Sequence, residues 1–202
     1  ALNADLPYDR FLTLQLAADE LSGTELESPE QLFATGFLLA GPDMPDINLQ
    51  EERRHQFLNG MTANVGEVLL GLQFGCAQCH DHKADPLSQH DYYRLRACFE
   101  TIRLFDEPVI EIAAGDDGAA RKVTARTTVA LQTTPAPSRL WVRGDFRRPG
   151  PELLPAPPRV AVSTGHEVAF TEDGPGRRRQ LAERITSSEN PLTARGLVNR
   201  GW

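Results

Sequence analysis

Gly71 to Leu95 reads GLQFGCAQCHDHKADPLSQHDYYRL, and this stretch decides which kind of fold to expect. At its centre lies CAQCH (residues 76–80), which has the C-x-x-C-H spacing of a c-type haem attachment site. Two thiols three positions apart can add to the two vinyl groups on one edge of a porphyrin, and the adjacent imidazole is then placed to bind the iron. The pattern therefore predicts haem c held by Cys76, Cys79 and His80.

Three other interpretations of the same residues stay open. A thioredoxin-like redox pair is expected at the start of a helix after a strand, whereas a helical pattern from Asn48 to Gly71 precedes this motif. A site for zinc or another divalent metal needs more ligands, and His82 and Asp85 are close enough in sequence to complete a compact one with His80. The cysteines can also be inert, and Cys98, the remaining one, stands alone.

A haem iron held by His80 has one open axial position. His90 follows a proline-containing loop and has the freedom to reach back to the iron, whereas His82 is too near His80 to reach the opposite face of the ring. A five-coordinate iron is an equal alternative. Lys83 is placed to pair with a haem propionate, and Asp81 and Asp85 to orient the imidazole by hydrogen bonding.

Two further candidate ligands, His55 and Met61, lie on the helical pattern before the motif. At 1.5 Å per residue, a straight helix places them about 30 and 22 Å from Cys76, which is too far for ligation. A helix break at Gly66 or Gly71 would shorten these distances. Because glycine in a helix costs about 1 kcal/mol relative to alanine, such glycines predict either close packing or a break.

Apolar residues recur at three- and four-residue steps on both sides of the motif, which is typical of amphipathic helices. The upstream stripe comprises Phe57, Leu58, Met61, Val65, Val68, Leu69 and Leu72. The downstream stripe comprises Tyr92, Leu95, Cys98, Phe99 and Ile102. The motif therefore lies between two helices, and we expect residues 1–104 to form a small helical domain of the kind that holds haem c.

Helix starts are predicted where a capping residue or a proline precedes an apolar stripe. Pro7 begins the first helix. The predicted caps are Ser28 with Pro29 and Gln31, Asn48 with Glu51, Ser88 with Asp91, and Asn190 with Pro191. The helices that follow them account for most of the chain outside its middle third, so a mainly α fold is expected.

The pattern changes between residues 105 and 170. Short β-rich runs separated by glycine and proline pairs predict strands at Val109–Ile112, Val123–Leu131 and Leu140–Val142. Proline-rich Pro149–Pro158 is expected to be extended. We therefore expect a β-containing or irregular spacer after the helical domain.

Helical patterns return at Arg177–Ile185 and Pro191–Trp202. This pair is too short to be a domain, so we expect residues 171–202 to be the start of a second helical domain. The chain is accordingly expected to be a fragment of a longer protein.

The composition excludes several classes of protein. The 202 residues carry a formal net charge of −7, which argues against nucleic-acid binding. No apolar run approaches the roughly 20 residues needed to cross a membrane. Three cysteines are too few for a disulfide framework. No Ser-His-Asp set, phosphate-binding loop or paired-carboxylate site stands out, so hydrolysis is not predicted and whether the chain is an enzyme stays open.

Several sequence blocks, in order along nearly the whole chain, resemble one known family. The blocks are ATGFL (residues 34–38), GCAQCHDHK (75–83) with Asp85-Pro86, DYYRL (91–95), Arg143-Gly144-Asp145, and NPLTAR (190–195) with Val198-Asn199-Arg200. Together they are similar to a domain of unknown function, and to the start of the domain that follows it, in planctomycete-type cytochrome c-domain proteins.

The resemblance implies an exported protein with a cytochrome c domain upstream in the same chain as its redox partner, or a separate redox partner protein. It also implies redox steps linked to the breakdown of complex carbohydrates, with a polysaccharide as a further ligand. Covalent haem c is normally made outside the bacterial inner membrane, so the periplasm or cell surface is the expected location.

The function predicted is therefore c-type haem binding with electron transfer in a larger exported bacterial protein. The alternative is a structural module, or one that binds a carbohydrate or a partner, in which residues 76–85 form a metal-stabilised or inert loop. The two hypotheses differ in whether Cys76 and Cys79 carry a covalent pigment.

Overall fold

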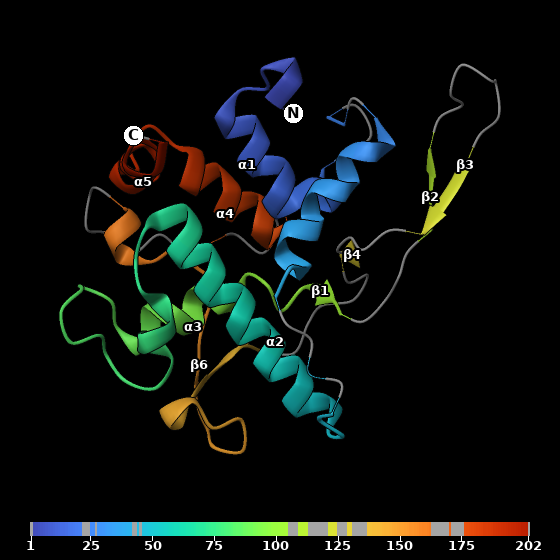
Figure 1. Cartoon of the computed structure of the whole chain (residues 1–202). Coiled ribbons are helices and arrows are strands. Elements are labelled where there is room, and N and C mark those ends of the chain that lie inside the picture. The colour runs from blue at the N-terminus through green and yellow to red at the C-terminus, as the bar shows by residue number, and fades with distance from the viewer. Residues whose placement is uncertain are drawn as a thin grey trace.

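The computed structural model describes residues 2–21, 25–26, 28–41, 44, 46–104, 109–112, 121–124, 129–130, 137–162, 170 and 176–201. Helices make up most of it and the strands are short, which confirms the predicted mainly α fold with a β-containing spacer (Figure 1). Leu131 and Trp202, the predicted ends of a strand and of the last helix, lie outside these residues. No helix in the described ranges is long and apolar enough to cross a membrane.

The frame of the described part of the chain consists of the α-helices α1 (Tyr8–Ala17), α2 (Gln50–Val65), α3 (Gln89–Ala97), α4 (Arg177–Thr186) and α5 (Pro191–Gly201). The remaining helical segments are of the 3₁₀ type except where stated: η1 (Leu2–Ala4), η2 (Ala18–Glu20), η3 (Pro29–Leu39), η4 (Gly66–Leu70, a π-helix), η5 (Phe74–Gln78), η6 (Val142–Gly144) and η7 (Arg159–Ala161). Helix α2 crosses the middle of the molecule, with α3 and η5 packed on it (Figure 1).

A reversal of the chain after α2 returns the next segment onto that helix. The π-helix η4 continues α2 from Gly66, and Gly71 then adopts a left-handed conformation with φ 70°. Phe74 packs back onto Gly66 so closely that a Cβ on this glycine would lie 2.1 Å from Phe74 Cδ2. Both predictions for these glycines are therefore confirmed: Gly66 permits close packing, and Gly71 marks the break.

Helix α3 begins at the predicted capping box. Ser88 Oγ accepts a hydrogen bond from the Asp91 N–H at 3.0 Å, and Asp91 Oδ2 accepts one from the Ser88 N–H at 3.0 Å. Arg159, from the segment after the strands, donates to Asp91 Oδ1 at 3.2 Å. Although burial alone would raise the pKa of Asp91, the hydrogen bonds from Arg159 and Ser88 hold it below its ordinary value.

Of the predicted caps at Ser28 and Asn48, the first is confirmed in position and the second is wrong. Ser28 occupies the N-cap position of η3 with Pro29 in its first turn, but it makes no side-chain capping bond, and this helix is of the 3₁₀ type. Helix α2 begins at Gln50 after Leu49, two residues beyond Asn48, so Asn48 does not occupy the capping position. Asn190 does cap α5 as predicted, because its Oδ1 accepts a hydrogen bond from the Leu192 N–H at 3.1 Å.

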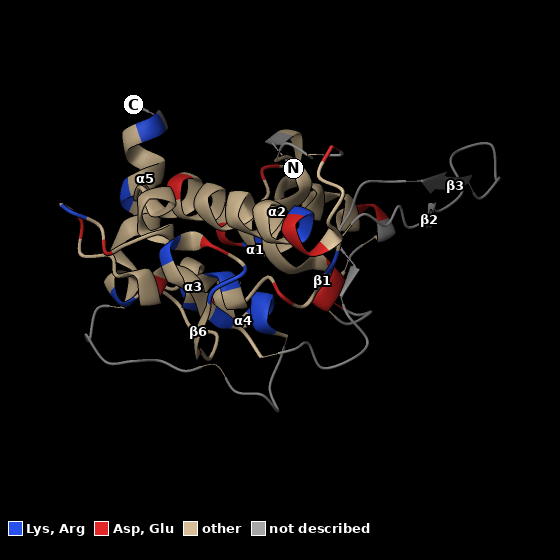
Figure 2. Cartoon of the chain, turned by 90° about the horizontal axis from the view of Figure 1, so that it is seen from below, with Lys and Arg blue, Asp and Glu red and all other residues tan. Residues whose placement is uncertain are grey.

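The C-terminal helices pack against the N-terminal part of the chain. Arg178 on α4 is fully buried, and its guanidinium donates to both carboxylate oxygens of Asp19 at 2.6 and 2.7 Å. Glu20 lies 3.1 Å from the same side chain. A buried cation needs such paired acceptors to offset its desolvation, so this pair fixes α4 against the end of α1 (Figure 2).

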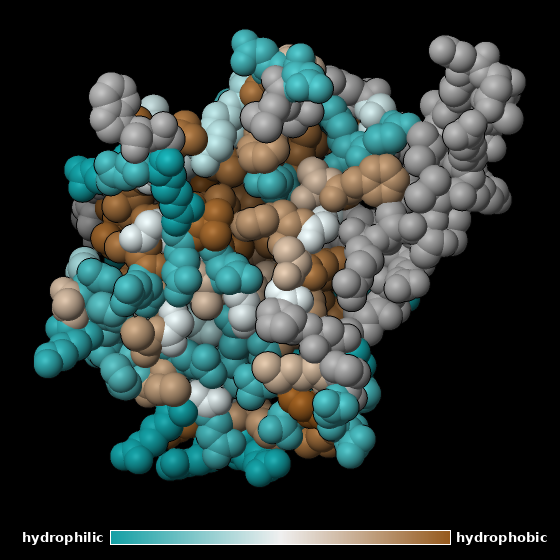
Figure 3. Space-filling model, in the orientation of Figure 1, coloured by the Kyte–Doolittle hydropathy of each residue, from teal (hydrophilic) through white to brown (hydrophobic). Residues whose placement is uncertain are grey.

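Helix α5 covers the end of α2. Arg200 donates to the carbonyl oxygens of Glu67 and Val68, which would otherwise be unpaired at a helix terminus. Val68, Leu197 and Val198 remain 42, 44 and 63% exposed. Hydrophobic residues gather in the upper half of the face shown in Figure 3.

Antiparallel strand pairs lie between α3 and α4 in sequence. In the described residues they are β1 (Ile102–Arg103) with β4 (Val129–Ala130), β2 (Val109–Ile112) with β3 (Arg121–Thr124), and β5 (Arg139–Trp141) with β6 (Pro149–Glu152). The strand predicted at 109–112 is confirmed. β3 and β4 overlap the strand predicted at 123–131, of which residues 125–128 and 131 lie outside the described residues, and β5 begins one residue before the strand predicted at 140–142. The first part of the extended proline-rich segment forms β6, which pairs with β5.

The contrast between two glycines of the long helical segment tests this packing. A Cβ added to Gly60 would meet no atom within 4 Å, so Gly60→Ala should raise the free energy of unfolding by about 1 kcal/mol through helix propensity. Gly66→Ala should lower it by about 1–3 kcal/mol because the methyl group overlaps the buried Phe74 ring. Urea unfolding of both variants measures the two effects, and equal stabilisation would contradict the Gly66–Phe74 contact.

Candidate functional site

The C-x-x-C-H motif begins in the short 3₁₀ helix η5, which contains Cys76 to Gln78, and ends with Cys79 and His80 directly after it. Phe74 and Ala77 are fully buried and anchor η5 in the core. Cys76, Cys79 and His80, the three residues predicted to hold haem, are all exposed.

The carbonyl of Gln78 fixes the motif to its neighbours. Gln78 O accepts hydrogen bonds from Tyr93 Oη at 3.1 Å and from Gln89 Nε2 at 2.9 Å. The same Gln89 amide also donates to Trp141 O at 3.2 Å. Two side chains of α3 therefore hold one backbone carbonyl between the two cysteines, and one of them, Gln89, also links the motif to β5.

The protonation of His80 follows from its hydrogen bond. His80 Nδ1 lies 2.7 Å from the carbonyl oxygen of Asp81, which can only accept, so Nδ1 carries the proton. A neutral imidazole has one protonated nitrogen, which leaves Nε2 with a free lone pair. This is the arrangement that a metal-ligating histidine adopts when a backbone carbonyl orients it.

His82 has the opposite protonation. Its Nδ1 accepts hydrogen bonds from the N–H groups of Asp85 at 2.7 Å and Ala84 at 3.2 Å, so the proton of the neutral ring is on Nε2. The Asp85 carboxylate lies 3.6 Å from this Nδ1, too far for a hydrogen bond. The His82 N–H donates to Leu87 O at 2.8 Å, so this histidine stabilises the loop through its own hydrogen bonds.

The other predicted site residues are separate from one another. Lys83 and His90 are both exposed, His90 in the first turn of α3. Asp81 Oδ1 accepts the Gln89 N–H at 2.7 Å and so supports the start of α3. Among the described residues, no three His, Cys, Asp or Glu side chains are grouped to hold a metal ion, so His80, His82 and Asp85 do not form the compact site considered from sequence.

Cys98 takes no part in the motif. It is fully buried at the end of α3, and burial raises the pKa of its thiol, which keeps it protonated. Met61 is also buried in the hydrophobic core, away from the exposed side of η5.

A residue pair that sequence analysis did not find lies beside Cys79. His55 on α2 donates from Nε2 to Gly144 O at 3.1 Å, and a Cβ on Gly144 would lie 3.0 Å from Cys79 Sγ. Because the chain reverses at Gly71, the motif lies beside His55, although His55 precedes the first cysteine by 21 positions in the sequence. No local signal could reveal this contact, because 89 residues separate His55 from Gly144.

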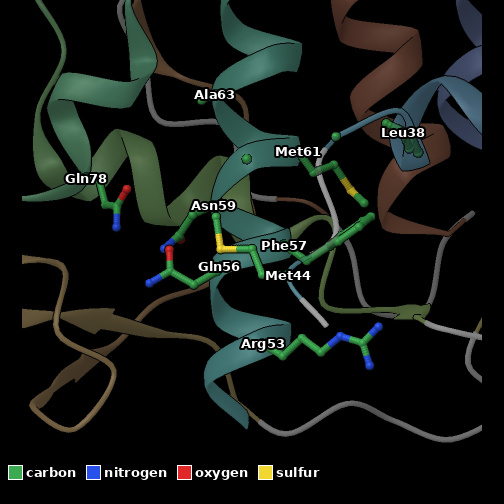
Figure 4. Close-up of a pocket in the computed structure, with 11 residues that line it drawn as sticks. Leu38, Met44, Arg53, Gln56, Phe57, Asn59, Met61, Ala63 and Gln78 are labelled. Atoms are coloured by element: carbon green, nitrogen blue, oxygen red, sulfur yellow. The ribbon is translucent and has the colours of Figure 1, made fainter. Parts of the chain in front are cut away.

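A cavity of about 220 Å³ lies over α2 next to the motif (Figure 4). Its walls include the apolar side chains of Met44, Phe57 and Met61 and the carboxamides of Asn59 and Gln78. Asn59 is 4% exposed, and neither its nitrogen nor its oxygen has a hydrogen-bond partner among the described residues. The cavity contacts the motif through Gln78.

The environment of His55 makes the stability of the fold depend on pH. Burial lowers the pKa of His55 to about 4, with Arg96 adding to the effect and the Gly144 carbonyl and Asp145 opposing it. Between about pH 6.5 and 4 the unfolded chain binds a proton that the folded chain does not, so stability falls as the pH is lowered, by up to about 1.4 kcal/mol per pH unit.

His55→Gln should remove this titration and keep an N–H donor for Gly144 O. We expect the free energy of unfolding to fall less steeply between about pH 6.5 and 4.5 in the variant than in the wild type, measured by urea titration at each pH. Parallel pH profiles for the two proteins would contradict a buried, neutral His55.

Comparison with known proteins gave one family. A model of the PSCyt2 family, described as a protein of unknown function (DUF1549), matches residues 1–104, just over half of the chain. This confirms the predicted domain of unknown function. No curated protein and no solved structure matched the chain. The matched segment contains the motif and α3, and it ends before the β5–β6 hairpin.

Proposed function

The chain belongs to the PSCyt2 family, whose function is unknown, and from this premise we propose that it binds haem c covalently and transfers electrons. Cys76 and Cys79 hold the porphyrin through thioether bonds, and His80 binds the iron through Nε2. The observation that carries the proposal is the hydrogen bond from His80 Nδ1 to Asp81 O, because it leaves Nε2 unprotonated beside two exposed thiols.

The residues present fit this chemistry. Each thiol adds across one vinyl double bond, so that a carbon–sulfur bond forms and the thiol hydrogen goes to the neighbouring carbon, with no net oxidation. Both sulfur atoms belong to exposed residues, so neither has to leave a packed core to react. Bound haem supplies one-electron transfer at its iron.

The anchoring of η5 supports the proposal further. Buried Phe74 and Ala77, with the Gln78 carbonyl held by Tyr93 and Gln89, fix the turn from which the two thiols and the imidazole project. A ligand attached here lies against the outside of the helical frame, where a redox partner can approach it. Lys83, exposed in the next loop, is available to pair with a propionate.

Partners and location follow from the same proposal. The electron partner is a separate redox protein or a cytochrome c domain of the same chain, and the periplasm or cell surface is the compartment, because covalent haem c is made there. A polysaccharide remains a proposed further ligand. Each of these depends on haem being present at Cys76 and Cys79.

Expression of the chain with a c-type maturation system tests the proposal. We expect a pyridine haemochrome spectrum with the pigment covalently retained after denaturation, because thioether bonds survive unfolding. Cys76→Ala combined with Cys79→Ala should abolish the covalent pigment, and His80→Ala should leave attachment possible but change the spectrum by removing the axial ligand.

Cys98→Ala is the matched control, since it removes the buried thiol that lies outside the motif and should leave the pigment unchanged. Colourless wild-type protein with Cys76 and Cys79 still free to alkylate would refute haem attachment. A zinc assay on the same preparation tests the alternative metal-stabilised module.

A further inference from the structure

The β5–β6 hairpin reaches the second cysteine of the motif. Its turn contains Gly144, and a Cβ at this position would lie 3.0 Å from Cys79 Sγ and 3.2 Å from Gln78 Nε2. Such distances are shorter than ordinary van der Waals contacts, so a side chain at this position would press on Cys79. The hairpin backbone therefore forms a wall on the Cys79 side of the motif.

Buried aromatic contacts hold this wall in place. His55 is 4% exposed and donates from Nε2 to Gly144 O at 3.1 Å. Its ring meets that of Trp141 edge-on at 5.7 Å and that of Phe146 at 5.9 Å. The hairpin thus encloses one side chain of α2, which fixes the position of Gly144 relative to the motif.

The turn itself has a backbone that is maintained only by its surroundings. Arg143 and Gly144 are both left-handed, with φ 56° and 75°. For a residue other than glycine this conformation costs about 1–2 kcal/mol, and it persists where neighbouring contacts impose it. Here the hydrogen bonds to Gly144 O from His55 and to Trp141 O from Gln89 supply that constraint.

We propose that the β5–β6 hairpin is part of the Cys76–Cys79 site and makes its two thiols unequal in reactivity, with His55 and Gly144 as positioning residues that hold the turn against Cys79. The three atoms nearest to an added Gly144 Cβ belong to Cys79 and Gln78 and not to Cys76, so Cys76 reacts first with an electrophile. The difference in reactivity between the two thiols does not depend on haem. The order of haem attachment that follows from it, first at Cys76 and then at Cys79, rests on the proposed function. The site thus extends beyond the family-matched residues 1–104.

Alkylation of the haem-free chain with iodoacetamide tests the proposal, because the peptides of Cys76 and Cys79 can be quantified separately by mass spectrometry. We expect Cys79 to react more slowly than Cys76. Gly144→Ala should lower the Cys79 to Cys76 rate ratio by about threefold or more, a barrier change of about 0.6 kcal/mol.

Gly60→Ala is the control for this variant. An added Cβ at Gly60 meets no atom within 4 Å, so the same methyl group is introduced without a contact. Its rate ratio should equal that of the wild type. Equal ratios in the wild type, Gly144→Ala and Gly60→Ala proteins would overturn the proposal.

The role of His55 has a separate test. His55→Ala frees the turn and should raise the Cys79 to Cys76 ratio toward one, whereas His55→Gln, which keeps a donor for Gly144 O, should restore the lower ratio. Identical ratios in the two variants would show that His55 does not position the turn. If His55→Ala fails to fold, the glycine pair still decides the proposal.

Maturation with haem separates this inference from the proposed function. Gly144→Ala protein should contain more haem attached through Cys76 alone than the wild type. If no variant takes up haem but the alkylation ratios shift as expected, the role of the hairpin is supported and haem binding is refuted. If haem attaches equally well in all variants and the alkylation ratios do not differ, haem binding is supported and the role of the hairpin is refuted.

Discussion

The contact between Gly66 and Phe74 is the constraint on which the site depends. A chain leaving α2 could continue in many directions, but the absence of a side chain on Gly66 lets the Phe74 ring pack against the helix, and left-handed Gly71 supplies the reversal. The motif is thereby returned onto α2 and meets α3 and the β5–β6 hairpin there. Without this contact Phe74 would lose its packing against α2, and the segment that carries the two cysteines would be held mainly by the hydrogen bonds of Tyr93 and Gln89 to Gln78 O.

Two histidines in the same loop illustrate how backbone hydrogen bonds assign chemical roles. His80 gives its Nδ1 proton to a carbonyl, whereas His82 receives N–H groups at the same atom. The first ring therefore offers a lone pair on its exposed side, and the second is used to hold the loop. The proposed division between an iron ligand and a structural histidine rests on this difference rather than on position within the motif.

Sequence patterns correctly predicted the features that depend on interactions between residues close together in the chain. The Ser88–Asp91 box and the Asn190 cap follow from side chains bonding within three residues, and Gly66 and Gly71 follow from the cost of glycine in a helix. Leu49 displaced Asn48 as the cap of α2, and η3 became a 3₁₀ helix, because tertiary packing outweighs such weak preferences. The hairpin wall at Cys79 was missed, since the contact between His55 and Gly144 is set entirely by tertiary structure.

Haem binding at this motif requires His80 to present an unprotonated Nε2 before any ligand binds. Long-range ¹H–¹⁵N NMR of the imidazole rings, recorded on the haem-free chain at about pH 8.5, measures this directly. We predict the Nδ1–H tautomer for His80 and the Nε2–H tautomer for His82 in the same spectrum. A protonated Nε2 on His80 would contradict the proposal, because the nitrogen assigned to the iron would then have no lone pair to give.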